Sequence, residues 1–172
     1  DSAIPLLKAR VSRDTTIIFP DANSYERFGC QFTEYRSLCL SKFDMRIIQK
    51  YNWPETGYDE HCLDNVLIVD DSILSGNTFE KCREALVEMG AKNISAYVTH
   101  AMFLNGSHQK FLFSDKYKKF YVTNTIPEMA NKLDGRNPFE VIKLDEAIKL
   151  SLLDLFNLDP KFANSSTMLN VY

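Results

Sequence analysis

The order of strand-like and helix-like segments predicts an α/β fold in which a mostly parallel sheet is flanked by helices. Short runs of β-branched and aromatic residues recur along the chain, and segments with helical spacing lie between them. Residues 66–69 are continuously apolar, which is typical of a strand that is covered on both faces. The length of 172 residues, with 45% hydrophobic residues, fits a single domain over residues 1–172.

The same patterns give each element a place in the chain. Runs rich in strand-forming residues predict strands at residues 15–19, 37–40, 65–69, 94–99, 120–123 and 139–144. Residues 24–33 are expected to be helical. The clearest helix begins at or near Thr78 and stops at Gly90. Its apolar face, at helical spacing, consists of Phe79, Cys82, Leu86 and Met89.

The segments between and after these elements are less regular. Residues 42–63 and 126–138 are long connections without a predicted element, and such loops are usually functional or mobile. A turn is expected over residues 105–107. The last amphipathic helix is marked by Ile148, Leu152 and Leu155, and the polar tail after Pro160 is expected to be an arm or a frayed end.

Composition excludes several classes of protein. A net charge of -3 gives no reason to expect a nucleic acid or an anionic membrane as partner. The sequence has no apolar run of membrane-spanning length and no signal-peptide pattern. Cys39 and Cys82 lie inside apolar patterns and are expected to be buried thiols, which favours a reducing, cytoplasmic setting. Because the chain begins at Asp1, it could be a fragment or a processed product of a longer protein.

Residues 66–78 carry the most informative motif. Four apolar residues lead into Asp70 and Asp71, and a loop with Ser75, Gly76 and Thr78 then leads into the clearest helix. The unpaired N–H groups and the positive dipole end of a helix N-terminus suit a phosphate. Adjacent carboxylates at the carboxyl end of a strand can bind sugar hydroxyls or Mg²⁺. The alternative is that the acids only solvate a strand end and that the hydroxyls only cap the helix.

This segment resembles the ribose-phosphate motif of the type I phosphoribosyltransferase fold, and its surroundings resemble ribose-phosphate pyrophosphokinase. Phe19-Pro20-Asp21-Ala22 followed by Arg27 is similar to the pyrophosphate-loop motif of that family. Residues 91–100 and 122–127 are similar to two further stretches that are typical of it. The resemblance covers residues 15–156 and corresponds to the C-terminal half of the enzyme.

The resemblance implies a role for each matching residue. The family transfers the pyrophosphoryl group of ATP to the C1 hydroxyl of ribose 5-phosphate, and catalysis consists mainly of positioning and charge neutralisation. The residues implied to cradle the 5-phosphate are Ser75, Gly76, Asn77 and Thr78. Those implied to bind the ribose hydroxyls, directly or through Mg²⁺, are Asp70 and Asp71. The pyrophosphate loop is implied to use Asp21, Ala22 and Arg27, with Asp21 as a further metal ligand. The catalytic cations are implied to be Lys42 and Arg46.

Plainer roles compete with these assignments. Lys42 could be an ordinary surface lysine, and Asp21 could simply begin a turn after Pro20. Residues 123–125 could only close a strand. His100 is better explained as a hydrogen-bonded residue at a strand end than as a general base.

The sequence also departs from the family pattern. Leu74 replaces an acid of the phosphate loop, and Asn23 and Ser24 replace two glycines of the pyrophosphate loop. Glu26 adds a negative charge there, and the region of Lys42 lacks the dense basic cluster of the family. In the family the N-terminal half supplies part of the ATP site, partly across a subunit interface. We therefore expect either that ATP binds differently or that the substrate is larger than ribose 5-phosphate.

The sequence thus predicts a Mg²⁺-dependent enzyme similar to ribose-phosphate pyrophosphokinase. Its expected partners are ATP or phosphoribosyl pyrophosphate (PRPP), and ribose 5-phosphate or a related ribosyl phosphate; the resemblance also implies a homo-oligomer. One alternative is a phosphoribosyltransferase that consumes PRPP and uses residues 42–63 as a hood over its base. The other is a catalytically weakened, synthetase-like subunit that regulates an active partner.

Overall fold

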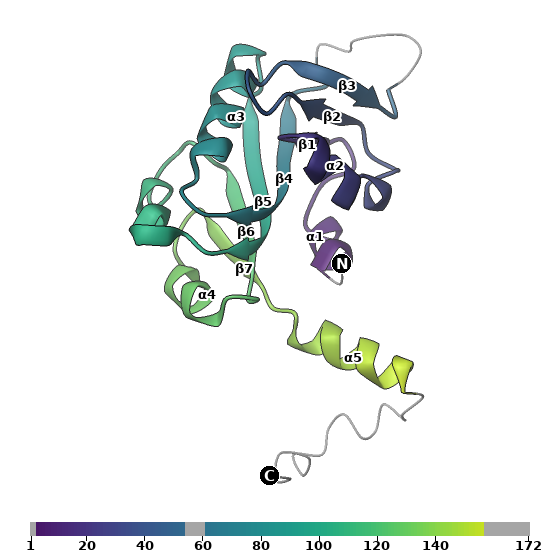
Figure 1. Ribbon diagram of the computed structural model, residues 1–172, viewed down its shortest axis with the longest axis vertical. Coiled ribbons are helices and arrows are strands. Elements are labelled where there is room, and N and C mark those ends of the chain that lie inside the picture. Colours follow the sequence, from purple (N-terminus) through teal and green to yellow (C-terminus); the bar gives the residue numbers. More distant parts are fainter. Residues whose placement is uncertain (1–2, 54–60, 157–172) are drawn as a thin grey trace.

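A seven-stranded sheet forms the centre of the computed structural model, which describes residues 3–53 and 61–156 (Figure 1). The strand order is β3-β2-β1-β4-β5-β6-β7, and all neighbours are parallel except β2 and β3. The strands are β1 (Thr16–Phe19), β2 (Ser37–Leu40), β3 (Ile47–Tyr51), β4 (Asn65–Ile73), β5 (Asn93–Ala101), β6 (Lys119–Thr123) and β7 (Phe139–Ile142). The α-helices are α1 (Ala3–Lys8), α2 (Ala22–Phe28), α3 (Asn77–Glu88), α4 (Pro127–Leu133) and α5 (Asp145–Leu155). The short 3-10 helices are η1 (Gly29–Gln31) and η2 (Leu104–Lys110). The predicted α/β fold with a mostly parallel sheet is confirmed.

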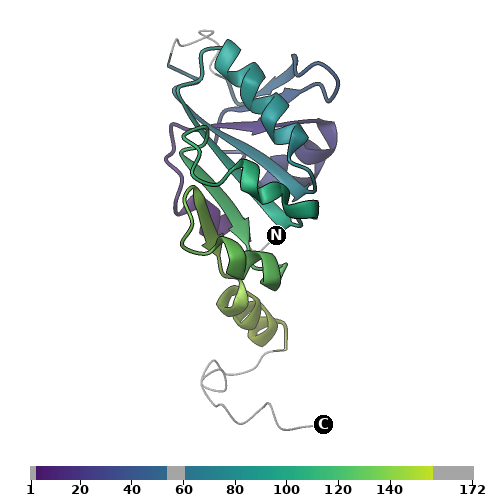
Figure 2. The same cartoon turned by 90° about the vertical axis from the view of Figure 1, so that its left-hand side faces the viewer.

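Both faces of the sheet are covered by helices. In β4, Val66 and Ile68 pack with α3 and α4, whereas Leu67 and Val69 pack with α1 and α2 on the opposite face. This alternation follows from the two-residue period of a strand. Figure 2 views the face that α3 covers, with the strands behind the helix. The continuously apolar sequence of β4 is therefore explained by burial on both sides.

Helix α3 fixes the loop that precedes it. The three buried side chains of α3 are Phe79, Cys82 and Leu86, all on one face as the sequence predicts. Burying a large apolar side chain contributes about 1.5–3 kcal/mol, so this face holds the helix firmly on the sheet. The helix ends where Gly90 takes a positive φ of 92°, which confirms the predicted stop.

Strand β4 is longer than the sequence suggests. The prediction that it ends at residue 69 is wrong, because its backbone continues through Asp70 and Asp71 to Ile73. Asp70 pairs with Val98 of β5, and Ile73 pairs with Ala101. The polar side chains hide this extension, since β-propensity reflects packing more than backbone pairing.

Both predicted long connections contain an element. Residues 42–63 include β3, an antiparallel edge strand whose central residues are exposed, so it lacks the apolar alternation that would reveal it. Residues 54–60 of this stretch lie outside the described residues. Residues 126–138 include α4, which starts at Pro127 and buries Met129 and Leu133. Proline is well placed at the first helical position because its missing N–H has no partner to lose there.

The remaining predictions differ only in detail. The helix expected at residues 24–33 is α2 followed by η1, the turn at residues 105–107 lies within η2, and β7 ends at Ile142. Cys39 and Cys82 are buried, as predicted. None of the helices in residues 3–53 and 61–156 combines the length and apolarity that crossing a bilayer requires. The predicted last helix is α5, which projects from the sheet and leaves Ile148, Leu152 and Leu155 about half exposed or more (Figure 1).

Candidate functional site

A cavity of about 370 Å³ lies at the carboxyl ends of β1 and β4. These strands are neighbours, yet the chain leaves β1 toward β2 on one side and continues from β4 to β5 on the other. Open α/β sheets bind ligands at such a switch point, because the loops diverge there. The lining residues come from the turn after β1, from Lys42 after β2, and from the end of β4 through the start of α3: Asp21, Asn23, Ser24, Arg27, Lys42 and all residues from Asp70 to Phe79.

The loop between β4 and α3 has the geometry of an anion site. Gly76 is the N-cap of α3 and takes a left-handed conformation with φ 79°. A Cβ atom added there would lie 2.6 Å from the ring of buried Phe111, so both the backbone and the packing require glycine. The alternative role of the hydroxyls as helix caps is weakly supported, since the only such contact runs from Asn77 N–H to Ser75 Oγ at 3.4 Å among the described residues. We call residues 73–77 the phosphate loop, after the role that the resemblance implies for residues 75–78.

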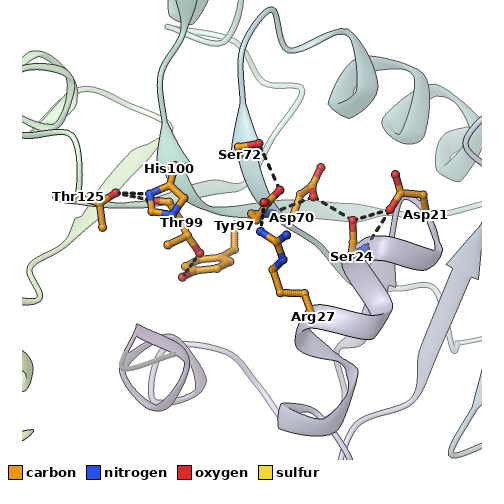
Figure 3. A network of polar contacts seen from close by, with 10 residues as sticks. Asp21, Ser24, Arg27, Asp70, Ser72, Tyr97, Thr99, His100 and Thr125 are labelled. Atoms are coloured by element: carbon orange, nitrogen blue, oxygen red, sulfur yellow. Dashed lines mark hydrogen bonds and ion pairs between the residues drawn. The ribbon is translucent and has the colours of Figure 1, made fainter.

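Asp70 lies at the floor of the cavity and is tied to the turn after β1. Its Oδ1 accepts the N–H of Asp71 at 2.9 Å and lies 2.9 Å from the Ser24 hydroxyl. The same hydroxyl lies 3.0 Å from Asp21 Oδ1, so Ser24 stands between the two carboxylates (Figure 3). Burial raises the pKa of Asp70 to about 6, because a carboxylate loses hydration there. The hydrogen bonds from Asp71 and Ser24 oppose that shift.

Asp71 faces a different partner. Its Oδ2 accepts a hydrogen bond from the Arg27 guanidinium, and its Oδ1 accepts one from the Ser72 hydroxyl at 3.2 Å. Arg27 comes from the last turn of α2, so this ion pair joins the two sides of the cavity mouth. The pair is partly exposed, with 58% of the Arg27 side chain accessible, which limits its contribution to stability.

The structure brings most of the predicted site residues together. Asp21 both caps α2, through the N–H of Ser24, and lines the cavity, so its turn-forming role and its site role coexist. Lys42 lines the cavity with its Nζ 4.0 Å from Asp21 Oδ2. Arg46 and Ala22 are not among the lining residues; Arg46 instead donates to Asp44 at 2.6 Å. The structure therefore gives Lys42, and not Arg46, a place beside the carboxylates.

A second polar group lies at the end of β5. His100 Nδ1 is 3.1 Å from the Thr125 hydroxyl, which in turn donates to the Thr99 carbonyl (Figure 3). This arrangement supports the plainer role of His100 as a hydrogen-bonded strand-end residue. Thr123 donates to the same carbonyl at 2.7 Å, as expected of a residue that closes a strand. Beside this group, burial raises the pKa of Tyr97 to about 12, so its phenol stays protonated at neutral pH.

Three residues that touch the phosphate loop were not predicted from the sequence. Ser107 and Lys110 bond to the loop, and the ring of Phe111 packs against Gly76. They stand more than thirty positions from the loop in the sequence, so no local spacing reveals them. The only signal was the predicted turn at residues 105–107, which indicates that the chain folds back after β5.

The carboxylates of the cavity suit Mg²⁺. Asp21 and Asp70 each use Oδ1 for Ser24, while Asp21 Oδ2 lies 4.0 Å from Lys42 Nζ. Within the described part of the chain, no group of three or more His, Cys, Asp or Glu side chains is arranged to hold a metal by itself. Magnesium is commonly bound by one or two carboxylates together with water and substrate phosphates, so this donor set fits.

Solved structures define the class of this fold. The chain resembles phosphoribosylpyrophosphate synthetase from Mycobacterium smegmatis with a TM-score of 0.64 and 17% sequence identity. The match covers 90% of this chain and 51% of that one. The sheet order, the cavity at the switch point and this likeness assign the chain to the type I phosphoribosyltransferase fold.

Curated relatives define the family more narrowly. The chain is 33% identical over 166 residues to the chloroplastic ribose-phosphate pyrophosphokinase 3 of Oryza sativa subsp. japonica, a match that covers 88% of the chain and 39% of the relative. It is 32% identical over 163 residues to ribose-phosphate pyrophosphokinase 4 of the same plant, covering 86% and 48%. The enzyme of Pasteurella multocida is 38% identical over 112 residues, covering 61% and 35%. A comparison with models of protein families finds no match.

The chain therefore belongs to the ribose-phosphate pyrophosphokinase family. It spans less than half the length of the curated relatives that it matches.

Proposed function

We propose that this chain is the phosphoribosyltransferase-like part of a Mg²⁺-dependent ribose-phosphate pyrophosphokinase, which transfers pyrophosphate from ATP to ribose 5-phosphate or a related ribosyl phosphate. In this reaction the C1 oxygen of the sugar bonds to the β-phosphorus of ATP, the bond from that phosphorus to the α-phosphate oxygen breaks, and AMP leaves. Catalysis of this kind depends on positioning and on neutralising charge.

One observation carries the proposal: the phosphate loop and two adjacent carboxylates line one cavity at the switch point of the sheet. The loop meets the N-terminus of α3, where backbone N–H groups and the helix dipole favour a phosphate. Asp70 and Asp71 lie within the same cavity, where they can accept hydrogen bonds from the ribose hydroxyls. The names of the curated relatives give the same activity.

The remaining residues of the cavity have complementary tasks. Lys42 supplies a cation beside Asp21, and Arg27 holds Asp71 in place. Asp21 and Asp70 would hold Mg²⁺, which supplies positive charge to the phosphates of ATP when it is bound. The two carboxylates that would ligate the metal come from separate elements: Asp21 from the turn after β1 and Asp70 from the C-terminal part of β4. The cation site is therefore assembled only in the folded chain.

The test is an assay of the full-length protein with ATP, Mg²⁺ and ribose 5-phosphate, in which AMP and PRPP are measured by chromatography. Wild type should release AMP in step with PRPP, and Asp71→Asn should lower the rate about 100-fold or more. Asp134→Asn is the matched control, since this exposed carboxylate pairs with Lys143 and neither residue lines the cavity. If no AMP forms with any ribosyl phosphate, the proposal is wrong. If PRPP is consumed only when a base is added, the protein is a phosphoribosyltransferase instead.

One observation weighs against the hood that a phosphoribosyltransferase would need. The described part of residues 42–63 includes β3, which pairs with β2 at the edge of the sheet instead of extending over the cavity. The compartment and the expected homo-oligomer stay predictions, and the names of plant relatives include chloroplastic and mitochondrial proteins.

A further inference from the structure

The segment after β5, residues 102–110, is bound to the phosphate loop by a continuous set of hydrogen bonds. The N–H groups of Met102 and Phe103 donate to the Ile73 carbonyl, each at 3.1 Å. The Leu74 carbonyl accepts from Leu104 N–H at 2.9 Å and from the Ser107 hydroxyl at 2.7 Å. The Ser75 carbonyl accepts from Lys110 Nζ at 3.1 Å. Three successive carbonyl groups of the loop thus point toward this segment.

The direction of these carbonyls fixes the direction of the neighbouring N–H groups. In a planar trans peptide, the C=O of one residue and the N–H of the next point to opposite sides. If the carbonyls of Ile73, Leu74 and Ser75 point to the segment, the N–H groups of Leu74, Ser75 and Gly76 point away from it. Leu74, Ser75 and Gly76 all line the cavity, so N–H groups that point away from the segment can donate to an anion bound there.

The segment that imposes this arrangement is itself firmly placed. Phe103, near the start of the segment, and Phe111, directly after its end, are buried in the core. The centroids of their rings lie 5.7 Å apart. Phe103 and Asn105 take left-handed backbone conformations with φ 44° and 54°, which residues with a Cβ atom rarely adopt. Such conformations persist only where surrounding structure fixes them, which indicates a defined loop and not a freely moving one.

The charge balance of the cavity is a second argument that Lys110 contributes to phosphate binding. The cavity is lined by three carboxylates but only two cations, Arg27 and Lys42, and both cations lie beside a carboxylate. Without bound Mg²⁺, a phosphate dianion therefore meets a formally negative cavity, and the loop itself contains no basic residue. Lys110 Nζ lies 3.2 Å from Asn77 Oδ1 as well as bonding to Ser75, so it brings a positive charge to the loop from behind.

We propose that Ser107 and Lys110 are positioning residues for the phosphate group of the substrate: they hold the loop with its N–H groups toward the anion, and Lys110 adds the missing positive charge. This inference rests on the proposed function and extends it to a segment outside the cavity lining. The recognised group is the 5-phosphate, so the effect should fall on binding of the ribosyl phosphate and not on binding of ATP.

The experiment measures dissociation constants for ribose 5-phosphate and for Mg²⁺-ATP by calorimetry, with the full-length protein. Lys110→Met should weaken ribose 5-phosphate binding about tenfold or more, the order expected for one hydrogen bond to a charged group. Ser107→Ala removes a hydrogen bond between neutral groups and should weaken binding about two- to tenfold. Binding of Mg²⁺-ATP should change less than about twofold, and Lys110→Arg should recover most of the affinity. Lys116→Met is the matched control, because Lys116 pairs with Glu80 at 2.9 Å and does not bond to the phosphate loop.

The outcomes separate the inference from the proposed function. If wild type binds ribose 5-phosphate and both variants bind it equally well, the inference is wrong and the proposed function stands. An equal loss for both ligands would also overturn it, because that result indicates a general structural role. If wild type binds no ribosyl phosphate, both the inference and the proposed function fail. Ser107→Ala keeps the test decisive if Lys110→Met does not fold.

Discussion

Replacing Gly76 by alanine should lower the free energy of unfolding by an amount that the structure allows us to work out. A non-glycine residue in the left-handed region costs about 1–2 kcal/mol. The new Cβ atom would also lie 2.6 Å from the ring of Phe111, which is fully buried and cannot swing into solvent. Overpacking of this kind costs about 1–3 kcal/mol. We therefore expect a loss of about 2–5 kcal/mol, or roughly 4–20 °C in Tm for a chain of this size.

The control for this prediction is another glycine of the same chain. Gly90 also has a positive φ, of 92°, but a Cβ atom there would meet nothing within 4 Å. Gly90→Ala should therefore show only the backbone cost of about 1–2 kcal/mol. Both variants are compared by urea unfolding. A Gly76→Ala protein that is no less stable than Gly90→Ala would refute the packing argument, as would a double variant with Phe111→Leu whose effects are simply additive.

Three further predictions concern the carboxylates and cations of the cavity. Asp71→Asn should weaken Mg²⁺-dependent binding of ribose 5-phosphate in calorimetry while the Tm stays close to wild type, and an unchanged affinity would reject the assigned role. Because burial raises the pKa of Asp70 to about 6, the folded state binds its proton more tightly than the unfolded state does, so metal-free stability should fall as pH rises from about 4 to 6. Asp70→Asn removes this dependence, so its free energy of unfolding relative to wild type should be more favourable at pH 7 than at pH 4. If urea unfolding gives the same difference between variant and wild type at both pH values, the prediction is wrong. Lys42→Met should lower the turnover rate about 100-fold or more and Arg46→Met much less, because Arg46 bonds to Asp44; the reverse order in the AMP assay would overturn the placement.

The sequence was most informative where one pattern decided the local structure. The apolar run of β4 and the helical spacing of α3 correctly located the strand, the helix and the loop between them, because burial leaves little choice of residue on the covered faces. Strand β3 escaped prediction because an exposed edge strand needs no alternation of apolar residues. Its sequence, Ile-Ile-Gln-Lys-Tyr, contains strand-forming residues but no alternation of apolar and polar ones.

The site could be predicted in its parts but not in its connections. Asp70 was recognisable from its local motif, and Asp21 and Lys42 from the resemblance to the family; the structure places all three around one cavity. The bridge through Ser24 and the bonds from Ser107 to the phosphate loop depend on distant segments meeting. Those contacts arise from the order of the strands, which local periodicity does not encode. Arg46, the second cation that the resemblance implies, bonds to Asp44 and does not line the cavity, so its role stays a prediction.

The extension of β4 past the apolar run limits the motion that we expect for Asp70. Asp70 lies on backbone that is paired with β5, in the middle of the sheet, instead of on a free loop. Amide protons in such a ladder exchange with solvent only through rare, cooperative openings, whereas those of loops exchange through frequent local ones. The carboxylate of Asp70 should therefore keep its position on the timescale of turnover, and slow deuterium uptake across residues 70–73 would be the sign of it.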